Sequence, residues 1–232
     1  MKIKTPAIKF CGFNRPGDAR AAGELGATYG GVILSKGSPR WVDIEYVPRV
    51  FMGSSLKRVG VFVDCSLPKI RYRCERGQLA VVQLHGEESP EEVRELKETG
   101  GWEVWKAIRI RSVNDFRSGI ESYAPVADGI LVEGWSPSGQ GGVGARFPWG
   151  KIKKYRDEVP PGVKFIVAGG LKSRNVGQCV RVLRPDVVDV SSGVETGIEG
   201  FKDDNRMGRF VNAVRREVER MEQRMEERME RA

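Results

Sequence analysis

Residues 79–109, LAVVQLHGEESPEEVRELKETGGWEVWKAIR, contain the pattern that decides the fold. The two apolar ends, 79–84 and 103–109, are typical of buried β-strands, whereas 90–99 has the apolar spacing of an amphipathic helix. Pro90 favours a helix start, where its missing N–H group costs nothing. Two largely apolar strands joined by a helix predict a parallel pair that is covered on both faces.

The same alternation extends in both directions from this segment. Strands are expected at 7–11, 29–34, 58–64, 79–84, 103–109, 129–133, 163–168 and 187–190. Helices are expected at 16–26, 44–51, 67–76, 90–99, 113–123, 149–157, 174–183 and from 205 onward. Eight strand–helix units predict an α/β fold with a single (β/α)8 barrel, a TIM barrel. The alternative is an open doubly wound sheet, but no Gly-x-Gly-x-x-Gly follows the first strand.

The end of the chain predicts an extended C-terminal helix. No linker rich in Pro, Gly or Ser divides the chain, so we expect a catalytic barrel domain over 1–214 and a charged helical extension over 215–232. An apolar ridge runs along this helix through Val211, Val214, Val218, Met221, Met225 and Met229. Its first half is expected to pack on the barrel. Its second half either frays in solvent or pairs with a partner, which leaves oligomerisation through this helix open.

The charge of the chain bears on its partners. Among 232 residues, 39 are Lys or Arg and 31 are Asp or Glu, which gives a formal net charge of +8. Segment 215–232 carries six Arg and six Glu, so the excess positive charge lies on the barrel. There it is dispersed and lacks the stripe of basic and aromatic residues typical of nucleic-acid surfaces. We therefore expect no nucleic-acid partner and an anionic small molecule instead.

Hydropathy and cysteine content bear on location. No apolar run approaches the roughly 18 residues that span a bilayer. Residues 1–10 also lack the apolar core of a secretion signal, so we expect a cytoplasmic protein with no membrane partner. The four cysteines contain no Cys-x-x-Cys pair and are too sparse for a disulfide scaffold, which predicts reduced thiols.

Candidate catalytic residues follow the predicted strands. In a (β/α)8 barrel the chemistry lies at the C-terminal ends of the strands. Cys11 ends the first predicted strand and Glu133 the sixth, so a thiolate and a carboxyl group can exchange protons with one substrate from two sides. Arg40 follows the second strand and suits bidentate binding of a carboxylate. The alternatives are that Cys11 is an inert buried residue and that His85 is structural.

Glycine-rich turns follow the sixth, seventh and eighth predicted strands. The candidates for contact with a phosphate group are Gly142, Gly169, Gly170, Ser191, Ser192 and Gly193. Glycines let backbone N–H groups approach an anion, and the loops after strands seven and eight are the usual phosphate position in this fold. The alternative is that these glycines only turn the chain. Three such loops at one rim favour a phosphorylated small-molecule substrate.

Several short motifs occur in a fixed order. They are Lys9-Phe10-Cys11-Gly12, Ser38-Pro39-Arg40, VGVFV at 59–63, VQLHGE at 82–87, GGL at 169–171 followed by Asn175-Val176, and VDVSSGVE at 188–195. Together, from about residue 8 to 214, they resemble the phosphoribosylanthranilate isomerase family of tryptophan biosynthesis. Enzymes of that family convert N-(5-phosphoribosyl)anthranilate to 1-(o-carboxyphenylamino)-1-deoxyribulose 5-phosphate. They do so by an Amadori rearrangement, without a metal or an organic cofactor.

The resemblance implies a role for each motif residue. Cys11 would be the general base that removes the proton from ribose C2, and Glu133 the general acid that protonates the ring oxygen. The other substrate contacts would be Arg40 at the anthranilate carboxylate, Asp189 near the bridging amine or the ribose hydroxyls, and Gln83 and His85 beside the aromatic ring. The glycine-rich loops would hold the phosphate group.

The chain departs from the family at one catalytic position. Glu133 stands where the family has Asp, and the following loop, 134–144, is one residue longer than in the family. Because a misplacement of about 1 Å costs on the order of a hundredfold in rate, either the backbone has withdrawn to suit the longer side chain or activity is weak, and we expect the former. The chemistry needs a thiolate, so the pKa of Cys11 is expected to be lowered.

Two alternative functions stay open: another phosphosugar isomerase or epimerase, and a non-catalytic phosphosugar-binding or assembly subunit on the same barrel.

Overall fold

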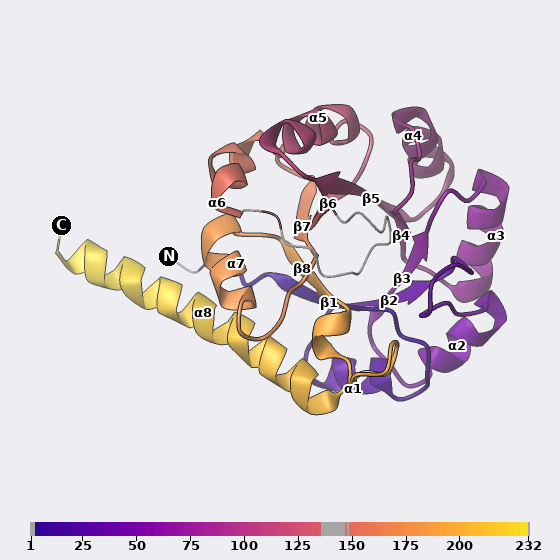
Figure 1. The fold of residues 1–232 in the computed structure, drawn as a ribbon, viewed down its shortest axis with the longest axis horizontal. Coiled ribbons are helices and arrows are strands. Elements are labelled where there is room, and N and C mark those ends of the chain that lie inside the picture. The colour runs from indigo at the N-terminus through magenta and orange to yellow at the C-terminus, as the bar shows by residue number, and fades with distance from the viewer. Residues whose placement is uncertain (1–2, 136–146, 148, 232) are drawn as a thin grey trace.

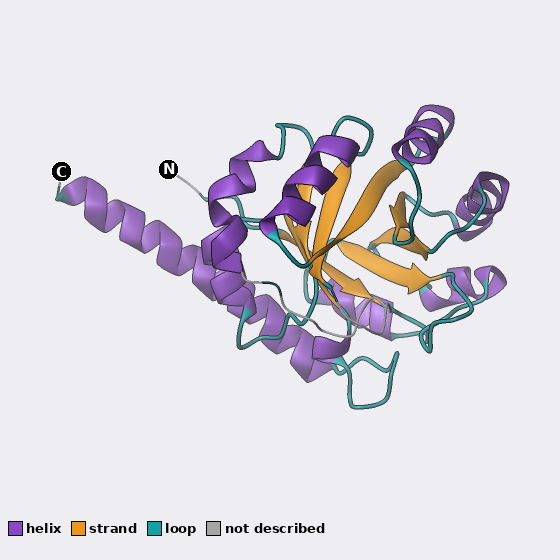
Figure 2. Cartoon of the chain, turned by 45° about the horizontal axis from the view of Figure 1, so that its top comes forward, coloured by secondary structure: helices purple, strands orange, loops and turns teal. Residues whose placement is uncertain are grey.

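Eight parallel strands form a closed barrel. A computed structural model of the chain describes residues 3–135, 147 and 149–231. The strands follow one another around the barrel in sequence order, and helices surround them (Figures 1 and 2). They are β1 Ala7–Cys11, β2 Tyr29–Ile33, β3 Lys57–Phe62, β4 Val81–Leu84, β5 Glu103–Ile110, β6 Gly129–Gly134, β7 Lys164–Val167 and β8 Val187–Val190. The predicted (β/α)8 barrel is confirmed.

The helices connect successive strands. The α-helices are α1 Asp18–Glu24, α2 Val47–Val50, α3 Leu67–Gly77, α4 Pro90–Thr99, α5 Val113–Tyr123, α6 Trp149–Ile152, α7 Val176–Leu183 and α8 Asp204–Glu230. Short 3-10 helices are η1 Ile44–Tyr46, η2 Lys153–Glu158 and η3 Ser192–Val194. The bounds of α4 and α5 match the prediction because each begins with a capping box, in which Ser89 and Ser112 bond reciprocally with the residue three positions later.

Other boundaries differ from the prediction for local reasons. The helix expected from Pro16 begins at Asp18, because the preceding Gly17 has a φ of 97°, which a right-handed helix does not contain. The strand expected from Leu79 begins at Val81, because the Leu79 N–H bonds to the Cys74 carbonyl at 2.9 Å and completes the end of α3. The helices expected at 44–51 and 149–157 are each divided between a 3-10 and an α segment.

The interior of the barrel is filled by one apolar cluster. It contains Ala7, Tyr29, Val59, Val81, Trp105, Ala107, Leu131, Ile166, Ala168 and Val187. The rings of Tyr29 and Trp105 meet edge to face with centroids 4.9 Å apart. A larger cluster fills the space between strands and helices. Because side chains alternate along a strand, residues two positions after a member of the inner cluster point inward, nearer the C-terminal end of the barrel.

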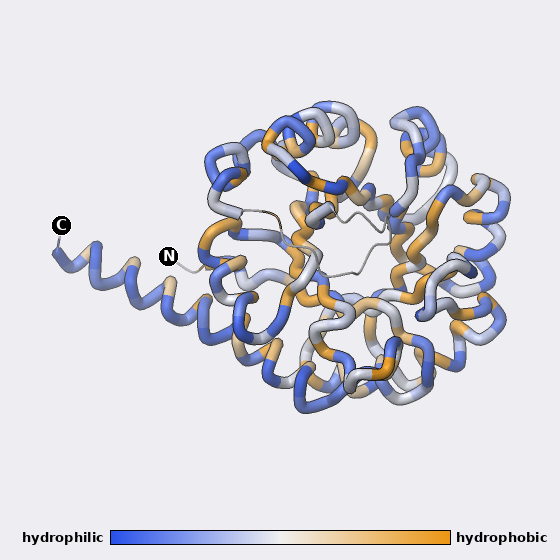
Figure 3. The backbone as a smooth tube through the Cα atoms, viewed as in Figure 1, coloured by the Kyte–Doolittle hydropathy of each residue, from blue (hydrophilic) through white to orange (hydrophobic). Residues whose placement is uncertain are grey.

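The last helix extends beyond the barrel. Its apolar side is buried from Met207 and Phe210 as far as Met221, whereas Met229 is 70% exposed. The distal part of α8 projects away from the barrel in Figure 1 and is mostly hydrophilic in Figure 3. The prediction that only the first half of this helix packs on the barrel is therefore confirmed. Within the described part of the chain, no helix is both long and apolar enough to cross a membrane.

Candidate active site

Five polar side chains lie directly above the apolar interior of the barrel. Each follows a member of the inner cluster by two or four residues along the same strand: Lys9 and Cys11 on β1, Gln83 on β4, Glu133 on β6 and Asp189 on β8. All five are buried, with Cys11 the most exposed at 8%. Buried polar side chains at this end of a (β/α)8 barrel indicate a functional site. The structure thus brings together four residues that the sequence analysis had chosen separately, Cys11, Gln83, Glu133 and Asp189, and adds Lys9 to them.

Lys9 and Asp189 form a buried ion pair. They are register partners on adjacent strands β1 and β8, and Lys9 Nζ lies 2.8 Å from Asp189 Oδ2. Burial lowers the pKa of Lys9, but the charges and hydrogen bonds of Asp189 and Cys11 together outweigh this and leave the pKa raised, so Lys9 remains an ammonium. Gly31, the register partner of Cys11, leaves space here: a Cβ on it would lie 2.8 Å from Cys11 Sγ and 3.2 Å from Lys9 Nζ. The ammonium group therefore lies beside the thiol.

The expectation of a lowered Cys11 pKa is wrong for the substrate-free protein. Burial raises the pKa of the thiol, the charge of Lys9 lowers it, and the charge of Asp189 raises it again, with a raised pKa as the net result. The physical reason is that a thiolate loses its hydration here while the nearest ammonium is shared with a carboxylate. Sequence reasoning missed Lys9 as a tuning residue, although it lies two residues before Cys11 in the quoted motif.

A network of hydrogen bonds and charges surrounds Glu133. His85 Nε2 lies 2.8 Å from Glu133 Oε1, and the other ring nitrogen, Nδ1, lies 2.9 Å from Gln83 Nε2. Arg109, the register partner of Glu133 on β5, has its Nε 3.7 Å from the same Oε1 and donates to the His85 carbonyl at 3.0 Å. The carboxyl group of Glu133 is therefore held between an imidazole and a guanidinium.

Arg40 is held by carboxylates of the chain itself. Its Nε and Nη2 donate to Oε1 and Oε2 of Glu195 at 2.7 and 2.8 Å, and Nη2 also lies 3.3 Å from Glu199 Oε1. Lys202 Nζ approaches Glu195 Oε1 at 2.9 Å. Burial raises the pKa of Glu195, but hydrogen bonds and charges from Arg40 and Lys202 outweigh it and lower the pKa to about 2. Glu195 thus fixes the predicted carboxylate-binding residue. Sequence reasoning did not assign Glu195 a role, although it ends the last motif.

The loops after β7 and β8 lie against each other. Gly169 and Gly170 have φ values of 83° and 63°, a region that favours glycine. Asn175 holds this turn by donating to the Gly170 carbonyl at 2.9 Å. A Cβ on Gly193 would lie 2.0 Å from the Leu171 carbonyl oxygen, so only glycine allows this approach of the two loops. The remaining phosphate candidates, Ser191 and Ser192, directly follow β8, whereas Gly142 lies outside the described residues.

Two buried oxygens in this site lack a hydrogen-bond partner among the described residues. They are Gln83 Oε1 and Asp189 Oδ1. Because buried acceptors are normally satisfied, such atoms mark contacts that a ligand can supply.

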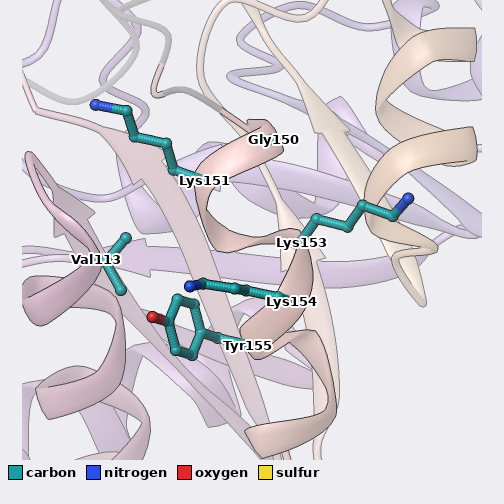
Figure 4. Close-up of a pocket in the computed structure, with 6 residues that line it drawn as sticks. All are labelled: Val113, Gly150, Lys151, Lys153, Lys154 and Tyr155. Atoms are coloured by element: carbon teal, nitrogen blue, oxygen red, sulfur yellow. The ribbon is translucent and has the colours of Figure 1, made fainter.

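A pocket between α5 and α6 lies outside this site (Figure 4). It is lined by Val113, Gly150, Tyr155 and three lysines, and it contains none of the candidate residues. No group of three or more His, Cys, Asp or Glu in the described segments is arranged to hold a metal ion.

Residues 8–213 match the family model described as N-(5'-phosphoribosyl)anthranilate (PRA) isomerase. The chain belongs to the phosphoribosylanthranilate isomerase family. The N-(5'-phosphoribosyl)anthranilate isomerase of Caldanaerobacter subterraneus subsp. tengcongensis is 39% identical over 90% of this chain and 97% of its own length. The corresponding protein of Gloeobacter violaceus is 36% identical over 88% of this chain and 91% of its own length.

Solved structures of the family have the same fold. The Thermotoga maritima phosphoribosylanthranilate isomerase has a TM-score of 0.82 at 33% identity, covering 90% of this chain and 98% of that one. Another phosphoribosylanthranilate isomerase structure is a complex with reduced 1-(o-carboxyphenylamino)-1-deoxyribulose 5-phosphate. It has a TM-score of 0.79 at 31% identity, with the same coverage. The predicted family and enzyme class are confirmed: the chain is an isomerase of tryptophan biosynthesis that acts on a phosphorylated small molecule.

Proposed function

We propose that Cys11 and Glu133 are the base and the acid of an Amadori rearrangement. The observation that carries this proposal is that both are buried, inward-facing residues at the C-terminal ends of β1 and β6, each within its own charged network. Glu133 protonates the ring oxygen of N-(5'-phosphoribosyl)anthranilate as the furanose opens, and Cys11 removes the proton from ribose C2. One proton enters the substrate and one leaves, and tautomerisation of the resulting enol gives 1-(o-carboxyphenylamino)-1-deoxyribulose 5-phosphate, an isomer of the substrate.

The other candidate residues orient the substrate in this proposal. The buried Oδ1 of Asp189 suits the N–H of the bridging amine, because it is an acceptor that lacks a partner in the described part of the protein. Arg40, already fixed by Glu195, binds the anthranilate carboxylate through its remaining N–H groups. The phosphate group is bound by the loop residues Gly142, Gly169, Gly170, Ser191, Ser192 and Gly193.

The protonation state of Cys11 shapes the expected pH dependence. Its raised pKa means that the thiol form predominates at neutral pH in the free enzyme. Since the base must be a thiolate, kcat/KM should rise with pH until Cys11 has ionised. Lys9 is the group that keeps the thiolate within reach, because its ammonium opposes the cost of burial.

A turnover assay with freshly prepared N-(5'-phosphoribosyl)anthranilate, followed by the fluorescence of the anthranilate group, tests the proposal. Cys11→Ser and Glu133→Gln should each reduce kcat by at least about a hundredfold, the usual range for an acid or a base. Circular dichroism checks that both variants are folded. Near-full turnover by either variant refutes its role. If the wild-type chain binds the substrate without turnover, the non-catalytic phosphosugar-binding or assembly function is the better description.

We further propose that residues 215–232 are an extension of the barrel domain 1–214 and that the enzyme acts in the cytoplasm. Met225 and Met229 continue the apolar ridge of α8 beyond the barrel, and Met229 is 70% exposed. This ridge can contact a second copy of the chain. A Thermotoga maritima member of the family is described as dimeric, which supports an oligomer but not a particular interface.

A further inference from the structure

We propose that Gln83 fixes the tautomer of His85, so that His85 acts as a positioning residue and donates its Nε2–H to the proposed acid, Glu133. The catalytic consequence rests on the proposed role of Glu133, whereas the tautomer itself does not. The chain has a single histidine, and its ring bridges two side chains from different strands.

The direction of each hydrogen bond follows from the charges around the ring. Glu133 Oε1 lies 2.8 Å from His85 Nε2 and 3.7 Å from Arg109 Nε, and a guanidinium can only donate, so this oxygen acts as an acceptor. His85 Nε2 must therefore hold a proton. In a neutral imidazole the other nitrogen, Nδ1, is then an acceptor, and the amide group that faces it at 2.9 Å is the Nε2 of Gln83, a donor.

Burial holds this arrangement in place. Gln83 is 1% exposed, and the side chains of His85 and Glu133 are 11% and 7% exposed. Water therefore competes little for these hydrogen bonds. The backbone of His85 is fixed as well, because Arg109 donates to its carbonyl at 3.0 Å. Among the described residues, Arg109 approaches both His85 and Glu133, and Glu87 pairs with Arg109 at 3.4 Å on the exposed side.

The tautomer determines how Glu133 presents its proton. If His85 donates to Oε1, a protonated Glu133 carries its proton on Oε2. When that proton leaves, the bond from His85 becomes a bond to a full carboxylate and strengthens, so it favours the transition state over the ground state.

Nitrogen-15 NMR of the full-length protein tests the tautomer, and the single histidine removes any ambiguity of assignment. In the neutral ring, Nε2 should give the signal of a protonated nitrogen and Nδ1 that of an unprotonated one. In Gln83→Glu an ionised carboxylate faces Nδ1 and can only accept, so Nδ1 should become protonated. A wild-type protein with Nδ1 protonated overturns the inference.

Kinetics of matched His85 variants test the consequence. His85→Gln keeps a donor near the Nε2 position, whereas His85→Leu removes it at similar volume. His85→Leu should lower kcat by about tenfold to a hundredfold, the effect of losing a hydrogen bond to a charged group. His85→Gln should recover most of that loss. If the role of His85 is purely structural, kcat falls equally in the two variants, and this result would overturn the inference.

The two proposals fail in different ways. If His85→Leu keeps full kcat while Glu133→Gln is inactive, the positioning role is wrong and the acid role of Glu133 stands. If both variants keep full kcat, the acid role of Glu133 is wrong, and the positioning role fails with it. The NMR result is independent of either outcome, because it is measured without substrate.

Discussion

Replacing Lys9 with Met tests whether one buried ammonium sets the reactivity of Cys11. A Cβ on Gly31 would lie 2.8 Å from Cys11 Sγ and 3.2 Å from Lys9 Nζ. The sum of these distances limits the separation of Sγ and Nζ to about 6 Å. At an effective dielectric constant of about 20, unit charges at that separation attract by about 3 kcal/mol, or about 2 pH units. The pKa of Cys11, already raised by burial, should therefore rise further in Lys9→Met. At a fixed pH below that pKa, the thiolate fraction should fall about a hundredfold.

The assay is the rate of iodoacetamide alkylation of Cys11 as a function of pH, measured by mass spectrometry of the peptide that contains it. Only the thiolate reacts, so the alkylation rate follows the thiolate fraction. Cys65, a partly exposed thiol, is the internal reference. Burial raises its pKa, and the charges of Arg73 and Lys69, rather than that of Lys9, lower it. Its alkylation should be the same in the wild type and the variant.

A second variant separates the charge of Lys9 from its ion pair. Lys9→Met alone leaves Asp189 buried without its partner, and removing one member of a buried pair costs about 3–5 kcal/mol of stability. The double variant Lys9→Met/Asp189→Asn removes both charges. It should be more stable than the single variant, and its Cys11 pKa should lie between those of the wild type and the single variant, because Asp189 also raises it. An unchanged pH profile for Cys11 in both variants would refute the reasoning.

Three further outcomes are expected. Gly31→Ala should reduce both kcat and Cys11 alkylation, because its Cβ would lie 2.8 Å from the sulfur, whereas Gly37→Ala, with nothing within 4 Å of its Cβ, should reduce neither. Folding lowers the pKa of Glu195 from 4.5 to about 2, so the ionised carboxylate stabilises the folded state. This stabilisation is fully present above the pKa of the unfolded state and is lost as the pH falls through the pKa of the folded state. The free energy of unfolding of the wild type, measured with urea, should therefore fall by on the order of 3 kcal/mol over that pH range. Glu195→Gln should not show this decrease. Removal of 222–232 should change the free energy of unfolding by about 1 kcal/mol or less, because that segment of α8 is mostly exposed. If the full chain is an oligomer through this helix, light scattering should give a smaller mass after truncation, and an unchanged mass argues against that interface.

Local features of the sequence determined the barrel and where its candidate residues lie along the chain. The bounds of β1, α4, α5 and β8 were predicted correctly, because alternation, amphipathic spacing and capping depend on residues only a few positions apart. Counting eight strands then predicted that Cys11 and Glu133 end β1 and β6. Two boundaries were missed for local reasons: the positive φ of Gly17 delayed the start of α1, and the bond from the Leu79 N–H to the Cys74 carbonyl delayed the start of β4.

Tertiary structure alone decided the electrostatics of the site. Lys9 and Asp189 are 180 residues apart in sequence, Arg40 and Glu195 are 155 apart, and His85 and Glu133 are 48 apart. The sequence indicated several of these residues but not the pairs, and it predicted a lowered Cys11 pKa where burial raises it. The physical reason is that a pKa depends on burial and on the distances between charges, and closure of the barrel sets both by bringing distant strand ends together.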